Sequence, residues 1–248
     1  MALLQSLVGV NQDHVRMITG PRGCPGAAGE RSAATGGAPP GSCAAEIMRS
    51  DFVPGGSFPD YELRDHSGTK RKLSELPGAD PMVLVLSRGA FCPKDREQHR
   101  LLVQMEPELK VAYTKIVTIS TDAMMEANEM RDGLGAHWPF LIDPERTVQR
   151  DLGIVEYTDP YHNPMIPPTL VLEPGLIIYS VYNGYWYWGR PSPAQLRTDL
   201  RAVSEKVRPD WDITAPGQRD AWERGDKSAF WPYGISLRDV FAAGASTD

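Results

Sequence analysis

Apolar positions along the chain fall into short continuous runs and longer helical patterns. Residues 82–86 and 114–120 form two runs with the length and the Val, Leu and Ile content of buried strands. A helical pattern follows each run. The first begins at Pro93, and the second begins after an N-cap at Thr121 or Asp122 and ends at Gly133 or Gly135. Strands that alternate with helices in this way predict parallel crossovers in one sheet.

Shorter patterns flank this central part. Residues 58–76 alternate around a turn cluster at 65–68, which predicts a hairpin. Residues 138–143 predict a short extended piece, and Pro144 is expected to open a further helix.

The apolar runs at 169–172 and 176–181, joined by Glu-Pro-Gly, predict a closing antiparallel hairpin. From Pro193 an amphipathic helix is expected, with Leu196, Leu200 and Val203 on one face. The pattern as a whole predicts an α/β fold with a mixed central sheet flanked by helices.

The first 48 residues have a different composition. The stretch 21–42 is rich in Gly, Ala, Pro and Ser, so it buries too little apolar surface to order itself. We therefore expect a disordered extension at 1–48, a domain at 49–207 and an irregular aromatic tail at 208–248 that packs on the domain. The apolar N-terminus lacks a basic flank and a cleavage site, so no signal peptide is expected. Met48 is an alternative start.

Composition narrows the partners. The formal net charge of −6 argues against a general nucleic-acid binder, and no run is long enough to predict a membrane span. The three cysteines, Cys24, Cys43 and Cys92, have no metal-ligand spacing, so neither a metal nor a cofactor is expected. A lone thiol fits a reducing compartment, and we expect a cytoplasmic protein.

Cys92 is the strongest candidate for chemistry. It lies between a predicted strand and a helix that begins at Pro93, where the helix dipole favours a thiolate. Arg88, Lys94 and Arg96 would favour the thiolate further if they turned inward. A thiolate attacks peroxides and disulfides. The alternative is that Cys92 is a small buried hydrophobe and that the charges are simply solvated.

Several segments resemble the peroxiredoxin-like alkyl hydroperoxide reductase/thiol-specific antioxidant (redoxin) family of the thioredoxin-like superfamily. The similarity extends over about residues 51–207. It is carried by the order and spacing of five stretches: 58–76, the R-G-A-F-C-P turn at 88–93, 118–122, 140–144 and the Pro-Thr-Leu segment at 168–170.

This resemblance implies that Cys92 is the nucleophile of an oxidoreductase and that Pro168 shapes the groove beside it. Asp95 stands where a CxxC motif would have its second cysteine, and it matches an acidic residue found there in some peroxiredoxins. Gly89 stands where the family has Thr or Ser. Pro167 or Pro168 stands where the family has an Arg. We expect Arg88 to supply the missing charge, and the backbone N–H groups at 91 and 92 to supply the missing hydrogen-bond donors.

A one-cysteine cycle needs an external reductant. The thiolate would become a sulfenic acid on reacting with a hydroperoxide, and a second thiol would restore it. Glutathione, mycothiol, a thioredoxin-like protein and the chain's own Cys24 or Cys43 are the alternatives. Exchange with a disulfide substrate is also open.

Aromatic residues gather late in the chain. Trp186, Trp188 and Arg190 could wall a substrate pocket together with Phe91 and Asp95, and Arg190 could replace the family's Arg. They could instead anchor an irregular segment, or form a partner or homodimer surface.

Two hypotheses follow. The first is a peroxiredoxin-like antioxidant peroxidase that works through Cys92. The second is a catalytically degenerate redoxin-fold binding module that uses its aromatic C-terminal segment.

Overall fold

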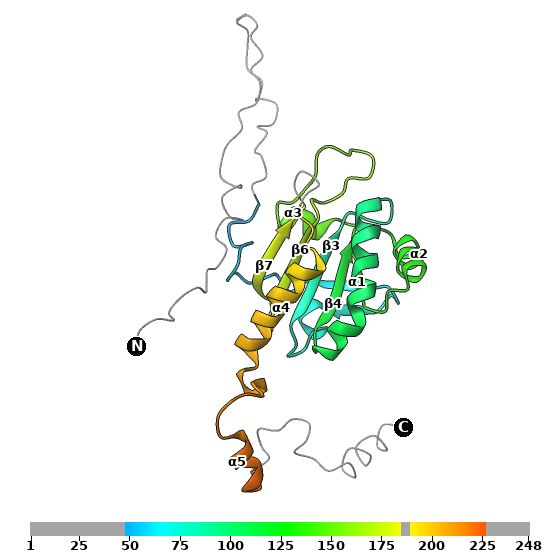
Figure 1. Cartoon of the computed structure of the whole chain (residues 1–248). Coiled ribbons are helices and arrows are strands. Elements are labelled where there is room, and N and C mark those ends of the chain that lie inside the picture. The colour runs from blue at the N-terminus through cyan, green and yellow to red at the C-terminus, as the bar shows by residue number, and fades with distance from the viewer. Residues whose placement is uncertain (1–47, 185–188, 227–248) are drawn as a thin grey trace, which may run out of the picture. The chain divides into compact units, whose positions relative to one another are not determined.

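The computed structural model of the chain describes residues 48–184 and 189–226. Helices and strands follow one another in the order expected for a thioredoxin-like redoxin (Figure 1). In chain order they are β1 (Glu62–Asp65), β2 (Lys70–Lys72), η2 (Leu73–Glu75), β3 (Met82–Ser87), α1 (Pro93–Val111), β4 (Lys115–Ser120), α2 (Met124–Leu134), β5 (Phe140–Ile142), α3 (Thr147–Asp151), β6 (Pro168–Glu173), β7 (Ile177–Asn183), α4 (Pro193–Val207), η4 (Pro209–Trp211) and α5 (Gln218–Glu223).

The seven strands form one mixed sheet in the order β2-β1-β5-β4-β3-β6-β7. β4 runs parallel to both β3 and β5, as the helical crossovers predict. The two hairpins and the β3–β6 and β1–β5 pairs are antiparallel. The predicted α/β class with a mixed sheet is confirmed.

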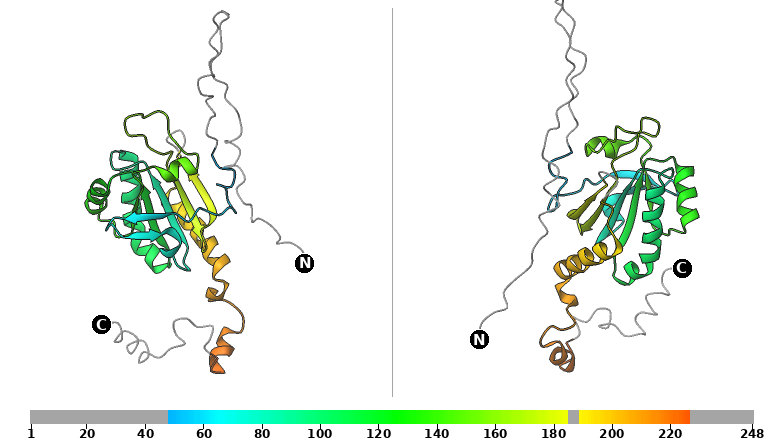
Figure 2. Two further views of the ribbon diagram at one scale, coloured as in Figure 1. Left: turned by 180° about the vertical axis from the view of Figure 1, so that it is seen from behind. Right: turned by 45° about the horizontal axis from the view of Figure 1, so that its top comes forward.

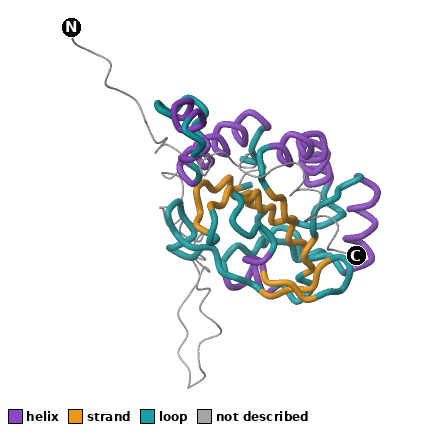
Figure 3. Tube along the Cα trace, turned by 90° about the horizontal axis from the view of Figure 1, so that it is seen from below, coloured by secondary structure: helices purple, strands orange, loops and turns teal. Residues whose placement is uncertain are grey.

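Each face of the sheet carries its own apolar core. On one face, Val83 and Val85 of β3 pack with side chains of α1, α2 and α4. On the other face, Leu84 and Leu86 pack with α3 and with the chain before β3. Figure 2 shows the sheet from two further directions, and Figure 3 shows the strands between the longer helices and a layer of loops. Every residue of β3 is buried, because a strand at the centre of a doubly covered sheet has no solvent face.

α4 forms as predicted. Ser192 caps its N-terminus by accepting the backbone N–H of Gln195, and Pro193 fills the first helical position. Leu196, Leu200 and Val203 are the buried residues of this helix. Their spacing of four and three residues places them on the single stripe that faces the sheet.

Two predicted helix starts are wrong. The helix expected at Pro144 begins at Thr147, because the Asp143 carboxylate accepts the backbone N–H groups of Thr147 and Val148 and so caps the helix there. α2 is capped at Ala123 rather than by Thr121 or Asp122. The Asp122 side chain turns away to bind the backbone N–H of Ala90.

The tail is described only as far as residue 226. Arg208 lies 4.2 Å above the Trp211 ring, whose centroid is 5.1 Å from that of Tyr113 at the end of α1. α5 has no buried residue. Residues 1–47, with Cys24 and Cys43, lie outside the described residues, so the expected extension stays a prediction.

The C-terminal ends of β3 and β4 meet at one edge of the sheet, where Ser87 pairs with Ser120. β6 runs the opposite way, so its first residue, Pro168, lies at this same edge. The turn that carries Cys92 leaves β3 there, and this edge holds the candidate site. Among the described helices, none combines the length and the apolar character needed to cross a bilayer.

Candidate functional site

Cys92 is the N-cap of α1, as its place before Pro93 predicts. Its backbone is extended, with φ −82° and ψ 113°, and its carbonyl accepts the N–H of Arg96 at 3.1 Å. The residue is only 1% exposed. The sulfur is therefore enclosed in this conformation, and the predicted position at a helix N-terminus is confirmed.

Arg88 lies beside this sulfur. Its Nη1 donates to Cys92 Sγ at 3.7 Å, so the guanidinium places positive charge where a thiolate would form. The other side of the guanidinium meets Glu156: Nη2 donates to Oε1 at 2.9 Å, and Nε lies 2.9 Å from Oε2. Burial works to lower the pKa of Arg88, but the charge of Glu156 and the neighbouring sulfur outweigh it and raise the pKa above its ordinary value.

Asp95 lies beneath the turn rather than in a substrate pocket. It is fully buried, and its Oδ2 accepts the Ser87 hydroxyl at 3.1 Å and the Arg88 backbone N–H at 2.6 Å. Its Oδ1 accepts a hydrogen bond from Arg190. The carboxylate is thus bound by protein groups on both oxygens, and its predicted role in substrate binding stays a prediction.

Arg190 follows β7 and reaches α1 through this ion pair with Asp95. Its charge is thereby compensated within the fold, and its buried Nε has no hydrogen-bond partner. This ion pair places Arg190 at the base of the Cys92 turn, whereas Arg88 donates to the sulfur, and the expected replacement of the family's Arg stays a prediction. Trp186 and Trp188 lie outside the described residues, and their predicted pocket stays a prediction.

Gly89 has a backbone that explains why Thr or Ser is absent there. Its φ is +124°, a value that side chains disfavour. A Cβ at this position would also stand 2.5 Å from Oδ1 of Asp122. Asp122 holds the turn through the Ala90 N–H at 2.8 Å, and burial raises the pKa of this carboxyl. The turn thus excludes the side chain that the resemblance would place at this position.

A loop between α3 and β6 covers the turn from the other side. An isolated bridge between Val155 and Met165 closes its base. The ring of His162 stacks on that of Phe91, with centroids 3.8 Å apart and planes 5° from parallel. Phe91 also lies 5.4 Å from the Arg88 guanidinium. Phe91 thus packs against this loop and beside Arg88 while 37% of the residue is exposed, and its predicted role in substrate binding stays a prediction.

Glu156 and His162 were not predicted from the sequence. They come from a polar, turn-rich stretch in which no periodicity marks one position above another. Asp159 orients His162, because its Oδ2 lies 2.8 Å from Nδ1 of the His162 ring. Both residues lie near the Cys92 turn only because of the way this loop folds, and the sequence pattern does not show that fold.

Pro168 is buried at the start of β6, the strand that lies next to β3 in the sheet. The next residue, Thr169, pairs with Val85 and accepts the Gln98 amide of α1 at 2.6 Å. α1 is therefore fastened to β6 six residues after Cys92. Pro168 shares the edge with the cysteine, as the resemblance implies.

A second polar network lies behind the turn. His99 donates from Nδ1 to the Asp95 carbonyl at 2.7 Å and accepts the Thr118 hydroxyl at Nε2 at 3.1 Å. Trp138 donates to the same hydroxyl oxygen at 3.0 Å. A carbonyl can only accept, so Nδ1 carries a proton, and burial lowers the pKa of His99, which favours the neutral ring.

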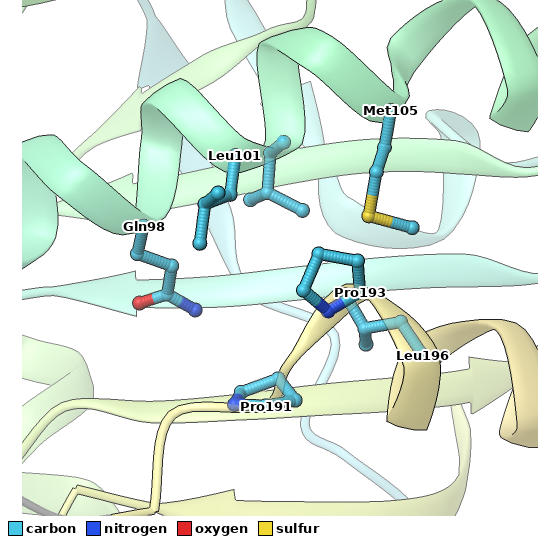
Figure 4. A pocket seen from close by; sticks show the side chains of 7 residues that line it. Gln98, Leu101, Met105, Pro191, Pro193 and Leu196 are labelled. Atoms are coloured by element: carbon cyan, nitrogen blue, oxygen red, sulfur yellow. The ribbon is translucent and has the colours of Figure 1, made fainter.

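Two hollows lie away from the sulfur. One is a cavity of about 10 Å³ between α1 and α4 (Figure 4), room for about one water. The other, of about 340 Å³, opens between the first hairpin and the start of α2. Neither of these two hollows is lined by Cys92 or Arg88.

Known proteins similar to this chain point to one family. A family model described as the AhpC/TSA family matches residues 54–181, just over half of the chain. Two Mycobacterium tuberculosis proteins named as candidate peroxiredoxins, Rv1608c and MT1643, are each 28% identical over 100 residues. That stretch is 40% of this chain and 65% of each relative, so the chain spans just under two thirds of their length.

Solved structures show the same fold. The peroxidoxin BcpB of Mycobacterium tuberculosis has a TM-score of 0.53 at 22% identity and covers 61% of this chain and 96% of its own. Enterococcus faecalis AhpC has a TM-score of 0.53 at 14% identity, covering 66% and 99%. Peroxiredoxin 6 of Arenicola marina has a TM-score of 0.52 at 19% identity, covering 62% and 73%.

At these identities the structural likeness concerns the fold alone. The family model does more, because it spans the chain from before β1 into β7 and includes the turn that carries Cys92. The chain therefore belongs to the AhpC/TSA family, as a peroxiredoxin-like redoxin of the thioredoxin-like superfamily.

Proposed function

We propose that this protein is a thiol-dependent peroxidase in which Cys92 is the single nucleophile. The observation that carries the proposal is the 3.7 Å contact between Arg88 Nη1 and Cys92 Sγ at the N-terminus of α1. A guanidinium and a helix N-terminus both stabilise a thiolate. Membership of the AhpC/TSA family supports the same reading.

The reaction would proceed in two stages. The Cys92 thiolate attacks one peroxide oxygen, so an S–O bond forms and the O–O bond breaks. The sulfur becomes a sulfenic acid, and the other oxygen leaves and takes a proton to become an alcohol or water. One external thiol then displaces water to form a mixed disulfide, and a second thiol releases the Cys92 thiol. The donors are a small-molecule thiol or a thioredoxin-like protein in a reducing, cytoplasmic setting.

Arg88 would act at two points of the first stage. Its Nη1 stabilises the thiolate before attack, and the same donor faces the leaving oxygen as charge develops there. The backbone N–H of Cys92 is bound to the Gly89 carbonyl at 3.1 Å, so it is not available to the peroxide while the turn keeps this shape. Arg88 therefore carries the electrostatic role that the family's Thr and Arg share.

The test compares the wild type with Cys92→Ser. Hydroperoxide-dependent oxidation of a thiol donor is expected in the wild type and is expected to vanish in the variant. Full activity in Cys92→Ser would remove Cys92 from the mechanism. Disulfide exchange is checked in parallel with a mixed-disulfide substrate and no peroxide.

A second candidate is a redoxin-fold binding module without catalysis. It is favoured by one observation, the 1% exposure of Cys92, since a sealed sulfur is also what a structural cysteine would show. Under this reading, stoichiometric hydrogen peroxide leaves the wild-type Cys92 unmodified while the protein stays folded.

A further inference from the structure

The Arg88 guanidinium has only one group available for the sulfur. Its Nη1 contacts Cys92 Sγ, while its Nη2 is bound to Glu156 Oε1 and its Nε lies against Oε2. Both side chains of this ion pair are largely buried, at 11% and 15% exposed. Glu156 therefore fixes which edge of the guanidinium faces Cys92.

Glu156 is itself held in place. The Thr158 hydroxyl donates to its Oε1 at 2.5 Å, and its backbone N–H donates to the Pro164 carbonyl at 3.1 Å across the base of the loop. The carboxylate is thus set on a closed loop rather than on a free surface side chain. A chain of contacts runs from Thr158 through Glu156 and Arg88 to the sulfur.

Two opposite effects of Glu156 can be separated. Its negative charge offsets part of the field of Arg88 at the sulfur and so disfavours a thiolate. Its hydrogen bond holds Nη1 against the sulfur and so favours one. A long, charged side chain that lost this anchor would turn toward water, because leaving a guanidinium buried without its partner is costly.

We infer that Glu156 is a positioning residue for the proposed peroxidase reaction: its Oε1 holds Arg88 so that Nη1 faces Cys92. This rests on the proposed function only for its consequence in catalysis, since the orientation of Arg88 toward a thiolate holds for any reaction of that sulfur. Nothing in the sequence motifs or in the family resemblance points to this residue.

The two contacts between Glu156 and Arg88 differ in kind. Nη2 to Oε1 is a hydrogen bond, whereas Nε has only an ion-pair contact with Oε2. Glutamine at 156 keeps the accepting Oε1 and removes the charge. Alanine removes both. Only the alanine substitution is therefore expected to disfavour the thiolate.

The experiment measures the rate of Cys92 alkylation by iodoacetamide as a function of pH, in the full chain with Cys24 and Cys43 replaced by Ser. The pH at half of the plateau rate reports thiolate formation, while the plateau also reports access through the loop. Glu156→Ala is expected to raise the half-plateau pH by roughly one unit, and Glu156→Gln to lower it or leave it unchanged. Glu173→Gln is the control: that carboxylate is 10% exposed and paired with Lys206, at the other end of β6.

The outcomes decide between three roles. A fall in the half-plateau pH in both Glu156 variants would mean that Glu156 only neutralises Arg88, and would overturn the inference. A change of plateau with no change of half-plateau pH would reduce Glu156 to a fastener of the loop, and would also overturn it. Because alkylation needs no peroxide, the inference can stand even if the same protein fails to reduce hydroperoxides.

Discussion

Nη1 of Arg88 lies 3.7 Å from Sγ of Cys92, across the turn that joins β3 to α1. The two residues are four positions apart, and Asp95 holds the turn between them by accepting the Arg88 N–H. The cation thus comes from the same turn as the nucleophile. It does not come from the later strand, where the family resemblance would place it and where Pro167 and Pro168 stand.

Replacing Arg88 tests this arrangement. Arg88→Gln removes the charge beside the sulfur, so the rate constant for Cys92 oxidation by hydrogen peroxide near neutral pH should fall about tenfold or more. Stopped-flow fluorescence or quenched mass spectrometry measures it. Arg197→Gln, which breaks an exposed pair with Glu108, is the matched control and should keep the wild-type rate. Equal rates in Arg88→Gln and the control would refute the role of Arg88.

Gly89 should not tolerate the family's side chain. Gly89→Thr places a β-branched residue at φ +124° and against Asp122, so the free energy of unfolding should fall by roughly 1–3 kcal/mol. Urea denaturation measures it. Gly133→Ala in α2 is the control, because a Cβ there has nothing within 4 Å. It should raise stability by about 0.5–1 kcal/mol. A stable, more active Gly89→Thr would show that the turn adopts another shape.

Stability should depend on pH through His99. Burial lowers its pKa below the ordinary 6.5, so below pH 6.5 the unfolded chain binds more protons than the folded chain. The free energy of unfolding therefore falls as the pH drops from about 7.5 to 5.5, by up to about 1.4 kcal/mol per pH unit for this one proton. The pKa of His66 is also lowered by burial and adds to the slope.

The raised pKa values of Asp122 and Asp143 act with the opposite sign. Comparing variants cancels these shared terms. His99→Gln should flatten the slope measured by urea denaturation, whereas His137→Gln, at an exposed position, should keep it. An unchanged slope in His99→Gln would show that His99 is not the titrating group.

The Asp95–Arg190 pair should be a strong constraint on the turn. Asp95→Asn leaves Arg190 charged, largely buried and without its counter-ion, so the free energy of unfolding should fall by about 3–5 kcal/mol. Denaturant titration measures it. Removing both charges, in Asp95→Asn with Arg190→Gln, should recover part of that loss. If the double variant were as unstable as the sum of the two single variants, the pair would not be coupled.

The strands and helices could largely be predicted because their signals are local. β3 and β4 are continuous apolar runs, and Leu196, Leu200 and Val203 mark one face of α4. The errors at Pro144 and Asp122 share one cause. In each case an aspartate carboxylate binds backbone N–H groups that the local pattern could not assign to it.

The site could be predicted only in part. Cys92 directly precedes the helix that begins at Pro93, and Arg88 is only four positions before Cys92. Both features could therefore be predicted from the local sequence. Glu156 is 68 residues from its partner, and the Asp95–Arg190 pair spans 95. Such pairs depend on how the loops fold over the edge of the sheet, which no local pattern encodes. For the same reason, the sequence left open whether the sulfur is buried.

The most direct test of the account is intact-protein and peptide mass spectrometry after one equivalent of hydrogen peroxide, with dimedone present to trap sulfenic acid. We expect the trapped adduct at Cys92 within seconds, and far less of it in Arg88→Gln. An unmodified Cys92 in folded protein after prolonged exposure would contradict the claim that this sulfur is an activated nucleophile.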